Sequence, residues 1–346
     1  MIQKLKLKNF RNFDLAEFLF CDEKNFIIWE NWKWKTNILE ALSLLSADKL
    51  NKIDFKNLVW ENWDTFFIEL TKTSWDIISI SFNKEENKKN YILNWKKTTK
   101  SKIKSITTKS VNFSPITMNM MYLSPSLRRE FLDWILLNTF DKYSITLKEY
   151  KNILNSRNKT LKAIKDWKIS ESELDFWDNK FVYISKIIYN YRFWLEKYLK
   201  ENITEARKYF FWKIQNIEFI YKTKIINNIE NDIKEYLVKN RQRDIILSST
   251  SIGPHIDDFD ILLDWKSLIE FASRWETKSI IIQLKFLEIK FIEKYANTKP
   301  ILLIDDFLSE LDEKHKNLIL DELNWYQTFI TSIKNQENYK NPIILN

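Results

Sequence analysis

A lysine and a threonine stand side by side at the end of an unusual aromatic segment. The segment reads Trp29-Glu30-Asn31-Trp32-Lys33-Trp34-Lys35-Thr36 and is followed by Asn37. With glycine at 29, 32 and 34 it would read G-E-N-G-K-G-K-T, which matches the phosphate-loop pattern G-x-x-x-x-G-K-[ST]. Its backbone N–H groups would then surround phosphate oxygens, Lys35 would contact the β- and γ-phosphates, and Thr36 would hold Mg²⁺. With tryptophan, the alternative is an aromatic surface loop whose three indoles fill the phosphate site.

Two carboxylates follow a short apolar run near the C-terminus, in Ile301-Leu302-Leu303-Ile304-Asp305-Asp306. A buried strand that ends in paired acids is typical of the second half of such a site. Asp305 would hold the shell of the Mg²⁺ ion, and Asp306 would polarise the attacking water. Paired acids also occur as simple helix caps, but a phosphate loop in the same chain favours the catalytic interpretation.

Two shorter motifs flank these carboxylates. With glycine at 275, Phe271-Ala272-Ser273-Arg274-Trp275-Glu276 reads F-A-S-R-G-E and resembles the signature of ABC-type ATPases, which binds the γ-phosphate of a nucleotide held by a second subunit. The alternative is a plain serine cap. Leu308-Ser309-Glu310-Leu311-Asp312 resembles the loop that crosses the dimer interface, with Asp312 near the nucleotide, or else a helix start. Farther on, Thr331 or Ser332 stands where these enzymes carry a switch residue.

The composition explains why tryptophan stands in these motifs. The 346 residues contain 15 Trp and 1 Gly, whereas average usage would give roughly 24 glycines. Asn-Gly and Asp-Gly are strong turn signals because a type I′ turn needs two positive φ angles, which tryptophan resists. Here Asn or Asp precedes tryptophan at Trp32, Trp63, Trp95, Trp134, Trp167, Trp265 and Trp325. We therefore hypothesise that the UGA codon is read as glycine and is shown as Trp, although Trp177 lies in a helical pattern and is expected to be a true tryptophan. The alternative is an unusually Trp-rich protein.

Charge and the reactive side chains limit the classes of function. The net charge of +8, from 55 basic and 47 acidic residues, suits a nucleic-acid partner without requiring one. A single Cys21 excludes disulfides within the chain and thiolate metal sites, and two histidines, His255 and His315, exclude a histidine-rich metal site. There is no apolar run of membrane-spanning length and no signal-peptide pattern, so we expect a soluble, cytoplasmic protein.

The elements that must position these motifs follow an α/β order. Strands are expected at 4–8, 25–28, within 66–83 and at 91–95, with a helix at 36–45 and a hairpin turn at Asn94-Trp95. Amphipathic helices dominate 124–239. Strands at 259–263, 300–304 and 327–331 then alternate with helices at 277–295 and from 312. The pattern predicts an α/β domain with a β-rich lobe (1–123), an inserted helical arm (124–240) and a second α/β part (241–346). Together with the resemblance of the motifs to those of ABC-type ATPases, this order implies an ABC-type P-loop ATPase head split by the arm.

Four further segments resemble the RecF family, and they run in the same order over nearly the whole chain. They are Asn9-Phe10-Arg11-Asn12-Phe13; Arg128-Arg129-Glu130-Phe131-Leu132-Asp133; Tyr150 with Leu154-Asn155-Ser156-Arg157-Asn158; and Gly253-Pro254-His255-Ile256-Asp257-Asp258-Phe259. Each also has a simpler interpretation, such as an arginine pair that anchors a helix. The chain departs from the family at Ile256 and Lys278, where arginine is usual.

The resemblance implies an ATP-dependent cycle. RecF-like proteins bind single- and double-stranded DNA, form homodimers around two ATP molecules with Mg²⁺, and separate after slow hydrolysis. ATP would lie between the phosphate loop of one subunit and Ser273 of the other, and would act as a timer on DNA residence. The family loads recombinase at gapped DNA together with RecO and RecR. The candidate DNA-backbone patch is a lysine run whose alternative is a solvated hairpin face: Lys88, Lys89, Lys96, Lys97, Lys100, Lys102 and Lys104.

Two other classes of function stay open at this point. If the tryptophans are real, the chain would be a DNA-binding or scaffold protein without nucleotide chemistry. It could also be another SMC-like ATPase, such as a coiled-coil tether or a nuclease partner. An arm of about 115 residues is too short for a long tether at roughly 1.5 Å per helical residue, and the sequence presents no nuclease metal cluster.

Overall fold

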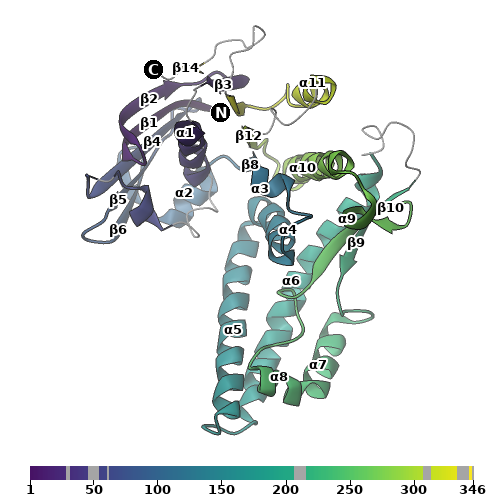
Figure 1. Cartoon of the computed structure of the whole chain (residues 1–346). Helices are drawn as coiled ribbons and strands as arrows, with labels where there is room; N and C mark the ends of the chain where they lie inside the picture. The colour runs from purple at the N-terminus through teal and green to yellow at the C-terminus, as the bar shows by residue number, and fades with distance from the viewer. Residues whose placement is uncertain are drawn as a thin grey trace. The chain divides into compact units, whose positions relative to one another are not determined.

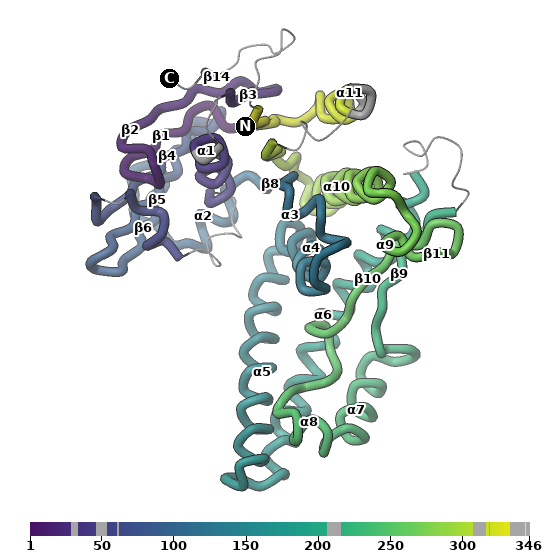
Figure 2. The backbone as a smooth tube through the Cα atoms, in the orientation of Figure 1, coloured from purple at the N-terminus to yellow at the C-terminus, as the bar shows by residue number. Residues whose placement is uncertain are grey.

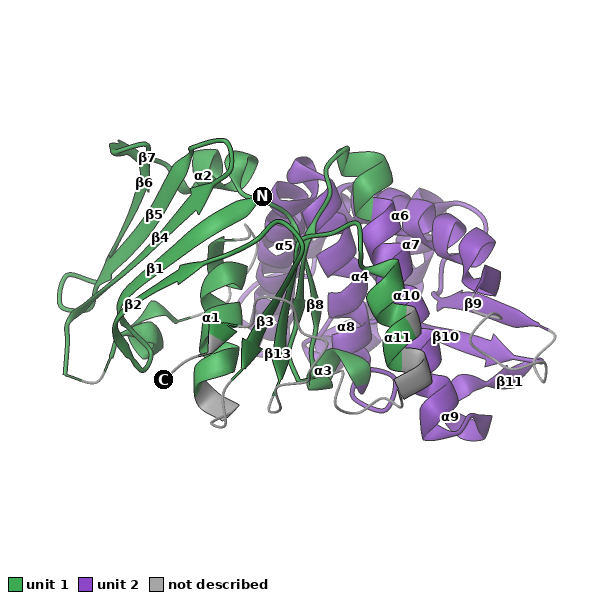
Figure 3. Cartoon of the chain, turned by 90° about the horizontal axis from the view of Figure 1, so that it is seen from above, with its two compact units in different colours: residues 1–118, 292–346 green, residues 119–291 purple. Residues whose placement is uncertain are grey.

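The computed structural model describes residues 1–28, 32–45, 54–60, 62–205, 216–306, 313–332 and 343–344. Two compact units form, one from residues 1–118 and 292–346 and the other from residues 119–291 (Figure 3). We call them the head unit and the arm unit. Among the helices of the described residues, none is both long and apolar enough to span a bilayer.

The head unit contains a six-stranded antiparallel sheet in the order β2-β1-β4-β5-β6-β7. One face alternates into the core, where Leu5 and Leu7 of β1 and Phe66 and Ile68 of β4 are fully buried. This period-2 burial is the reason that the segment forms strands. Its elements are β1 (Ile2–Phe10), β2 (Phe13–Leu19), β4 (Thr65–Lys72), β5 (Ile77–Asn83), β6 (Lys88–Leu93), β7 (Lys96–Thr98), the 3₁₀ helix η2 (Phe55–Leu58) and helices α1 (Trp32–Leu45) and α2 (Lys100–Ile106).

A second, parallel sheet of the head unit has the order β14-β3-β13-β12-β8. These strands are β14 (Ile343–Ile344), β3 (Lys24–Ile28), β13 (Thr328–Ser332), β12 (Ile301–Ile304) and β8 (Ser110–Phe113), with α3 (Pro115–Met118) and α11 (Glu313–Glu322) beside them in sequence. All four residues of β12 are buried. Because β3, β13 and β12 pair in parallel, their carboxyl ends share one edge, so Ile28 and Ile304 end at the same side of the sheet.

The arm unit is mainly helical and contains one small sheet. Helices α5 and α6 pack side by side as a long hairpin (Figures 1 and 2). The helices are α4 (Pro125–Thr139), α5 (Asp141–Lys165), α6 (Glu173–Asn202), α7 (Ile229–Lys239), α8 (Arg241–Leu247), α9 (Leu268–Phe271) and α10 (Arg274–Ala296), which ends in the head unit. The antiparallel sheet comprises β9 (Ile217–Lys222), β10 (Asp258–Leu263) and β11 (Lys266–Ser267).

The expected strands and helices are confirmed, with two differences. Strand β9 lies inside 124–239, which the sequence assigned to helices, although Ile217, Phe219 and Tyr221 alternate into the core. Surrounding helical periodicity hid this short period-2 run. The contact division also begins the second part of the head at 292 rather than at 241, because β10 pairs with β9 of the arm unit.

Four tryptophans occupy turn positions that favour glycine. Asn94-Trp95 (φ 47° and 67°) joins β6 to β7, and Asp264-Trp265 (φ 46° and 71°) joins β10 to β11, so both are two-residue hairpin loops with two positive φ angles. Trp75 has φ 63° between β4 and β5. Trp167 has φ 60° just past α5, where its N–H donates to the Ile164 carbonyl and the next N–H donates to the Ala163 carbonyl, as in a Schellman cap. All four side chains are at least 74% exposed.

Not every Asn-Trp or Asp-Trp pair is such a turn. Trp134 lies inside α4, so the expectation of a turn signal at Asp133-Trp134 is wrong. Trp177 lies inside α6, as expected. The written glycine, Gly253, has φ 126°, and a Cβ there would come within 2.8 Å of the Phe181 ring, so a larger residue would have to displace its neighbours.

Candidate functional site

Lys35 lies in the first turns of α1 and is fully buried. Its ammonium Nζ lies 3.2 Å from Oδ1 of Asp306, the second carboxylate after β12. A buried ammonium needs a counter-charge because its desolvation is costly. The lysine expected to bind phosphate and the acid expected to polarise water are therefore in direct contact.

Thr36 and Asp305 form the second contact across the same edge. The Thr36 hydroxyl lies 3.1 and 3.2 Å from the two carboxylate oxygens of Asp305. Thr331 at the end of β13 lies 3.1 Å from Oδ1 of Asp305, and its hydroxyl accepts the backbone N–H of Asp306 at 2.8 Å. Thr331, one of the two residues expected as the switch, thus touches both acidic residues.

The donors at this edge suit a hard cation. Burial raises the pKa of Asp305 above its usual range, and the hydroxyls of Thr331 and Thr36 partly offset this effect. A cation beside Asp305 would favour its charged form. Mg²⁺ is usually held by one or two oxygen side chains plus water and substrate phosphates, and Thr36 with Asp305 matches that requirement. No cluster of three or more His, Cys, Asp or Glu side chains suited to a metal is found among the described residues.

The contacts that hold α1 in place were not predicted from the sequence. Arg11 donates to both carboxylate oxygens of Glu40 at 2.7 and 2.8 Å and to the Asn57 carbonyl at 2.8 Å. The Asn37 side-chain amide donates to Oδ1 of Asn12 at 2.6 Å. The Asn9–Phe13 segment therefore ties the turn after β1 to the helix that carries Lys35. The expected contact of Asn37 with the nucleotide stays a prediction.

The aromatic side chains of the loop are only partly described. Trp29, Glu30 and Asn31 lie outside the described residues; Trp32 and Lys33 begin α1, but their side chains are not among those described. The Trp34 ring packs edge-on against Phe13 at 5.2 Å between ring centroids and contacts the hydrophobic core. The expectation that three indoles fill the phosphate site is therefore wrong for Trp34, because the core accommodates its ring.

Ser273 begins α10 in a reciprocal capping box. The Ser273 N–H donates to a Glu276 carboxylate oxygen at 2.8 Å, and the Glu276 N–H donates back to the Ser273 hydroxyl at 3.2 Å. Ser273 and Arg274 are exposed, and Trp275 follows them in the first turn. Both interpretations of the motif thus remain compatible: the serine caps the helix, and its surface is accessible to a second molecule. Asp312 lies outside the described residues.

The other family-like segments converge in the arm unit rather than at the phosphate edge. Arg128 forms a bidentate pair with Asp258, both contacts at 2.7 Å. Fully buried Arg157 bonds to Asp178 at 2.7 Å and to Asp244 at 3.0 Å. These segments therefore serve as an internal framework of the arm unit.

His255 belongs to this framework as a neutral acceptor. Its Nε2 lies 2.9 Å from the Thr250 carbonyl, so Nε2 carries the proton and Nδ1 accepts the Tyr150 hydroxyl at 2.6 Å. Burial lowers the pKa of His255 to about 4, and the nearby Arg129 and Arg192 guanidinium groups contribute. His255 is therefore a structural residue of the arm unit.

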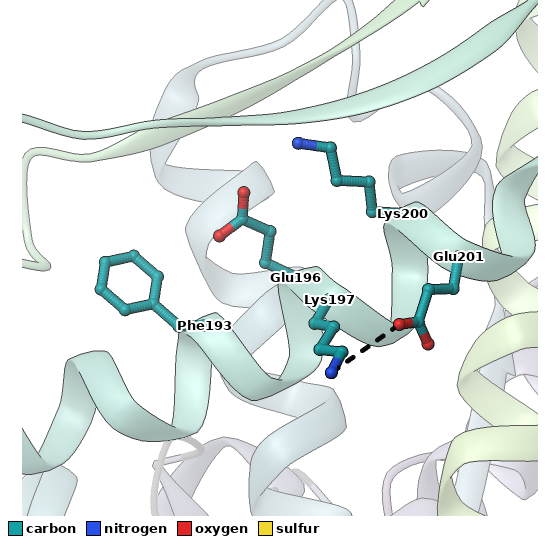
Figure 4. A pocket seen from close by; sticks show the side chains of 5 residues that line it. All are labelled: Phe193, Glu196, Lys197, Lys200 and Glu201. Carbon is teal, nitrogen blue, oxygen red and sulfur yellow. Dashed lines mark ion pairs between the residues drawn. The ribbon is translucent and has the colours of Figure 1, made fainter. Parts of the chain in front are cut away.

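A hollow of about 350 Å³ on the arm does not form a second site. Its lining comes from one face of α6, where Lys197 and Glu201 lie 4.0 Å apart (Figure 4): Phe193, Glu196, Lys197, Lys200 and Glu201. An open groove along one helix offers no convergent polar groups to a small molecule.

The expected lysine patch of the head is partly engaged within the chain. Lys88 and Lys89 of β6 and Lys96 and Lys97 of β7 are exposed. However, the Lys89 ammonium lies 3.9 Å from the Phe55 ring centre, and Lys88 lies 3.7 Å from Glu86. These contacts support the alternative of a solvated hairpin face at Lys88 and Lys89, and the seven-lysine DNA-backbone patch stays a prediction.

Comparison with known proteins shows full-length relatives. No protein-family model matches the chain. The DNA replication and repair protein RecF of Ruminiclostridium cellulolyticum is 30% identical over all of this chain and 96% of its own length. RecF of Clostridium perfringens is 32% identical over 95% of this chain and 92% of its own length. A solved structure of the recombination mediator protein RecF-ATP in the RecFOR pathway matches with a TM-score of 0.86 and 27% identity, over 98% of this chain and 93% of its own. The RecF-ATPrS structure matches with a TM-score of 0.88 and 26% identity, over 99% of this chain and 95% of its own.

Proposed function

The chain belongs to the RecF family of DNA replication and repair proteins, and on that premise we propose that it is an ATP-dependent DNA-binding protein of recombinational repair and replication restart. It has the α/β fold of the RecF structures, with an ATPase head, a β-rich lobe and inserted helices. The observation that carries the proposal is the convergence of Lys35 and Thr36 with Asp305 and Asp306 at one sheet edge.

The residues suggest how the site works. Lys35 exchanges the Asp306 carboxylate for the β- and γ-phosphates of ATP, and this exchange frees Asp306 to accept a proton from the attacking water. Thr36 and Asp305 would hold Mg²⁺, which would neutralise charge on the phosphates. Thr331, which contacts both acids, reports whether the phosphate is present.

The second half of the site comes from another copy of the chain. Exposed Ser273 and Arg274, with residue 275, bind the γ-phosphate held by the partner subunit. Asp312 is proposed from its sequence motif to act at the same interface. ATP-dependent homodimerisation then times residence on gapped DNA and on other single- and double-stranded DNA, and slow, DNA-dependent hydrolysis releases it. RecO and RecR are the expected partners of this cycle.

We infer further that the native protein carries glycine at the turn and phosphate-loop positions written as Trp. The four positive φ angles at Trp75, Trp95, Trp167 and Trp265 support this inference independently of the phosphate loop. Glycine at 29 and 34 would let the backbone approach the phosphates. A DNA-binding or scaffold protein without nucleotide chemistry is the alternative if tryptophan is present there.

The assembly state tests this proposal. In light-scattering measurements with ATP and Mg²⁺, we expect the full chain with glycine at 29, 32 and 34 to become dimeric, and with ADP to stay monomeric. Asp306→Asn should prolong the ATP-bound dimer because hydrolysis slows while nucleotide binding persists. If both the chain with glycine at 29, 32 and 34 and its Asp306→Asn variant stayed monomeric with ATP, the proposed cycle would be overturned.

A further inference from the structure

A line of lysines follows the solvent face of α5 in the arm unit. Lys148, Lys151, Lys159 and Lys162 are exposed, as are Asn152 and Asn155 between them. At about 100° per residue, these six side chains fall within an arc of about 100°, and the lysines span about 21 Å along the axis. Glu149, the one acid in the middle of the helix, lies outside this arc. We call these six residues the α5 stripe.

The stripe differs from most of the neighbouring helices in how its charge is balanced. Four of the six exposed lysines on α6 and α7 have carboxylate partners at 2.8 to 4.0 Å: Lys186 and Lys234 with Glu230, Lys197 with Glu201 (Figure 4) and Lys200 with Glu218. The other two, Lys180 and Lys239, lie at different places and form no run of unpaired charge. None of the four stripe lysines pairs with an acid in the part of the chain that the structure describes.

This imbalance costs stability unless a ligand relieves it. Lys148 and Lys151, and again Lys159 and Lys162, are three residues apart, and like charges at such spacing destabilise a helix slightly. A polyanion laid along α5 would neutralise both pairs at once. The six stripe residues are polar, and beside them α5 exposes Ile145, one turn before Lys148. One isoleucine offers a bilayer little apolar surface to bury, so the chemistry favours a soluble, extended polyanion.

We propose that the α5 stripe binds the phosphate backbone of DNA, and this rests on the proposed DNA-binding function. Its length of about 21 Å corresponds to about six phosphates of one strand of a duplex. Lysines act there as point charges and asparagine amides as additional donors, so the contact positions the DNA without reading its sequence. The inference places a DNA contact on the arm unit, whereas the lysine run of the head was the patch expected from the sequence.

The salt dependence of DNA binding tests the stripe. A fourfold Lys→Gln variant of the full chain at 148, 151, 159 and 162 is compared with one at 186, 197, 200 and 234, which removes the same charge from the paired lysines. Affinity for a fluorescent gapped duplex is measured by anisotropy over a range of salt. We expect the stripe variant to lose at least about tenfold in affinity at moderate salt. The log–log salt slope should fall by about three to four units, from four lysines at roughly 0.9 per phosphate contact. The control should change by less than about twofold.

A second variant guards against a folding defect. Asn155→Glu places one acid in the middle of the stripe at an exposed position and should weaken DNA binding severalfold, with unchanged circular dichroism and basal ATP hydrolysis. Equal losses in the stripe and control variants would overturn the stripe while leaving DNA binding intact. Absence of DNA binding by the unaltered chain would overturn the proposed function itself. If the unaltered chain bound anionic vesicles in the absence of DNA, and the stripe variant lost that binding but kept DNA binding, the stripe would belong to a lipid surface and the proposal would be overturned.

Discussion

The phosphate edge of the head and the buried framework of the arm use charged motif residues in opposite ways. At the phosphate edge, Lys35 and Thr36 each contact one acid of the Asp305-Asp306 pair, and these contacts can be exchanged for phosphate and Mg²⁺. In the arm unit, Arg128 and Arg157 have several fixed partners at 2.7 to 3.1 Å. A motif of charged residues can therefore mark either a site that changes partners or a framework that keeps them.

Breaking the framework should have the largest effect on stability. Arg157→Met leaves the buried Asp244 carboxylate without its guanidinium partner, and only the N–H and hydroxyl of Ser251 still donate to it. The loss should be about 3–5 kcal/mol of unfolding free energy, as for other buried pairs that lose one partner. Urea unfolding measures it. Lys186→Met is the control, because that ammonium is about half exposed and pairs at the surface with Glu230, which has no contact with Arg157; it should cost no more than about 1 kcal/mol. Similar losses for the two variants would erase the contrast.

Removing the exchangeable lysine should abolish chemistry rather than folding. In the chain with glycine at 29, 32 and 34, Lys35→Ala should slow ATP hydrolysis by about 10²–10³-fold, the usual cost of losing one charge-stabilising donor. Phosphate release measures the rate, and circular dichroism checks the fold. If Lys35→Ala instead hydrolysed ATP normally, the edge would be a structural ion pair like those of the arm.

Protonation offers a milder way to disturb the framework. The pKa of His255 is lowered to about 4, against about 6.5 for histidine in the unfolded chain. Between these values the unfolded state binds the proton and the folded state does not, so stability is full above pH 6.5 and falls as the pH drops toward 4. The loss should reach about 3 kcal/mol at most. Urea unfolding between pH 5 and 7 should show that the unfolding free energy falls as the pH drops. His255→Asn should remove this pH dependence, whereas His315→Asn should leave it unchanged.

The turn tryptophans should give the smallest effects, in both units. Trp95→Gly and Trp265→Gly should each raise the unfolding free energy by about 1 kcal/mol, because glycine adopts positive φ without the Cβ strain. Trp177→Gly inside α6 should lower it by at least about 1 kcal/mol. Thermal unfolding measures all three. Destabilisation by Trp95→Gly would argue that tryptophan is the native residue at that turn.

Sequence alone could predict residues whose chemistry fixes both type and spacing. Lys35 and Thr36 after one strand and Asp305 and Asp306 after another had to meet once the strands were parallel. The hairpin at Asn94-Trp95 followed from turn geometry. The Arg11–Glu40 pair and the partners of Arg157 could not be predicted, because they depend on how segments 21 to 93 residues apart pack together. Strand β9 was within reach, but its six residues were outweighed by the helical pattern around them.

ATP hydrolysis as a function of protein concentration tests the central claim most directly. The full chain with glycine at 29, 32 and 34 is assayed with and without gapped duplex DNA. The account predicts slow phosphate release. Its rate per chain should rise with protein concentration, because each site needs Ser273 of a second copy, and DNA should increase the rate further. A rate per chain that is independent of concentration and of DNA, or the absence of hydrolysis at every concentration, would contradict it.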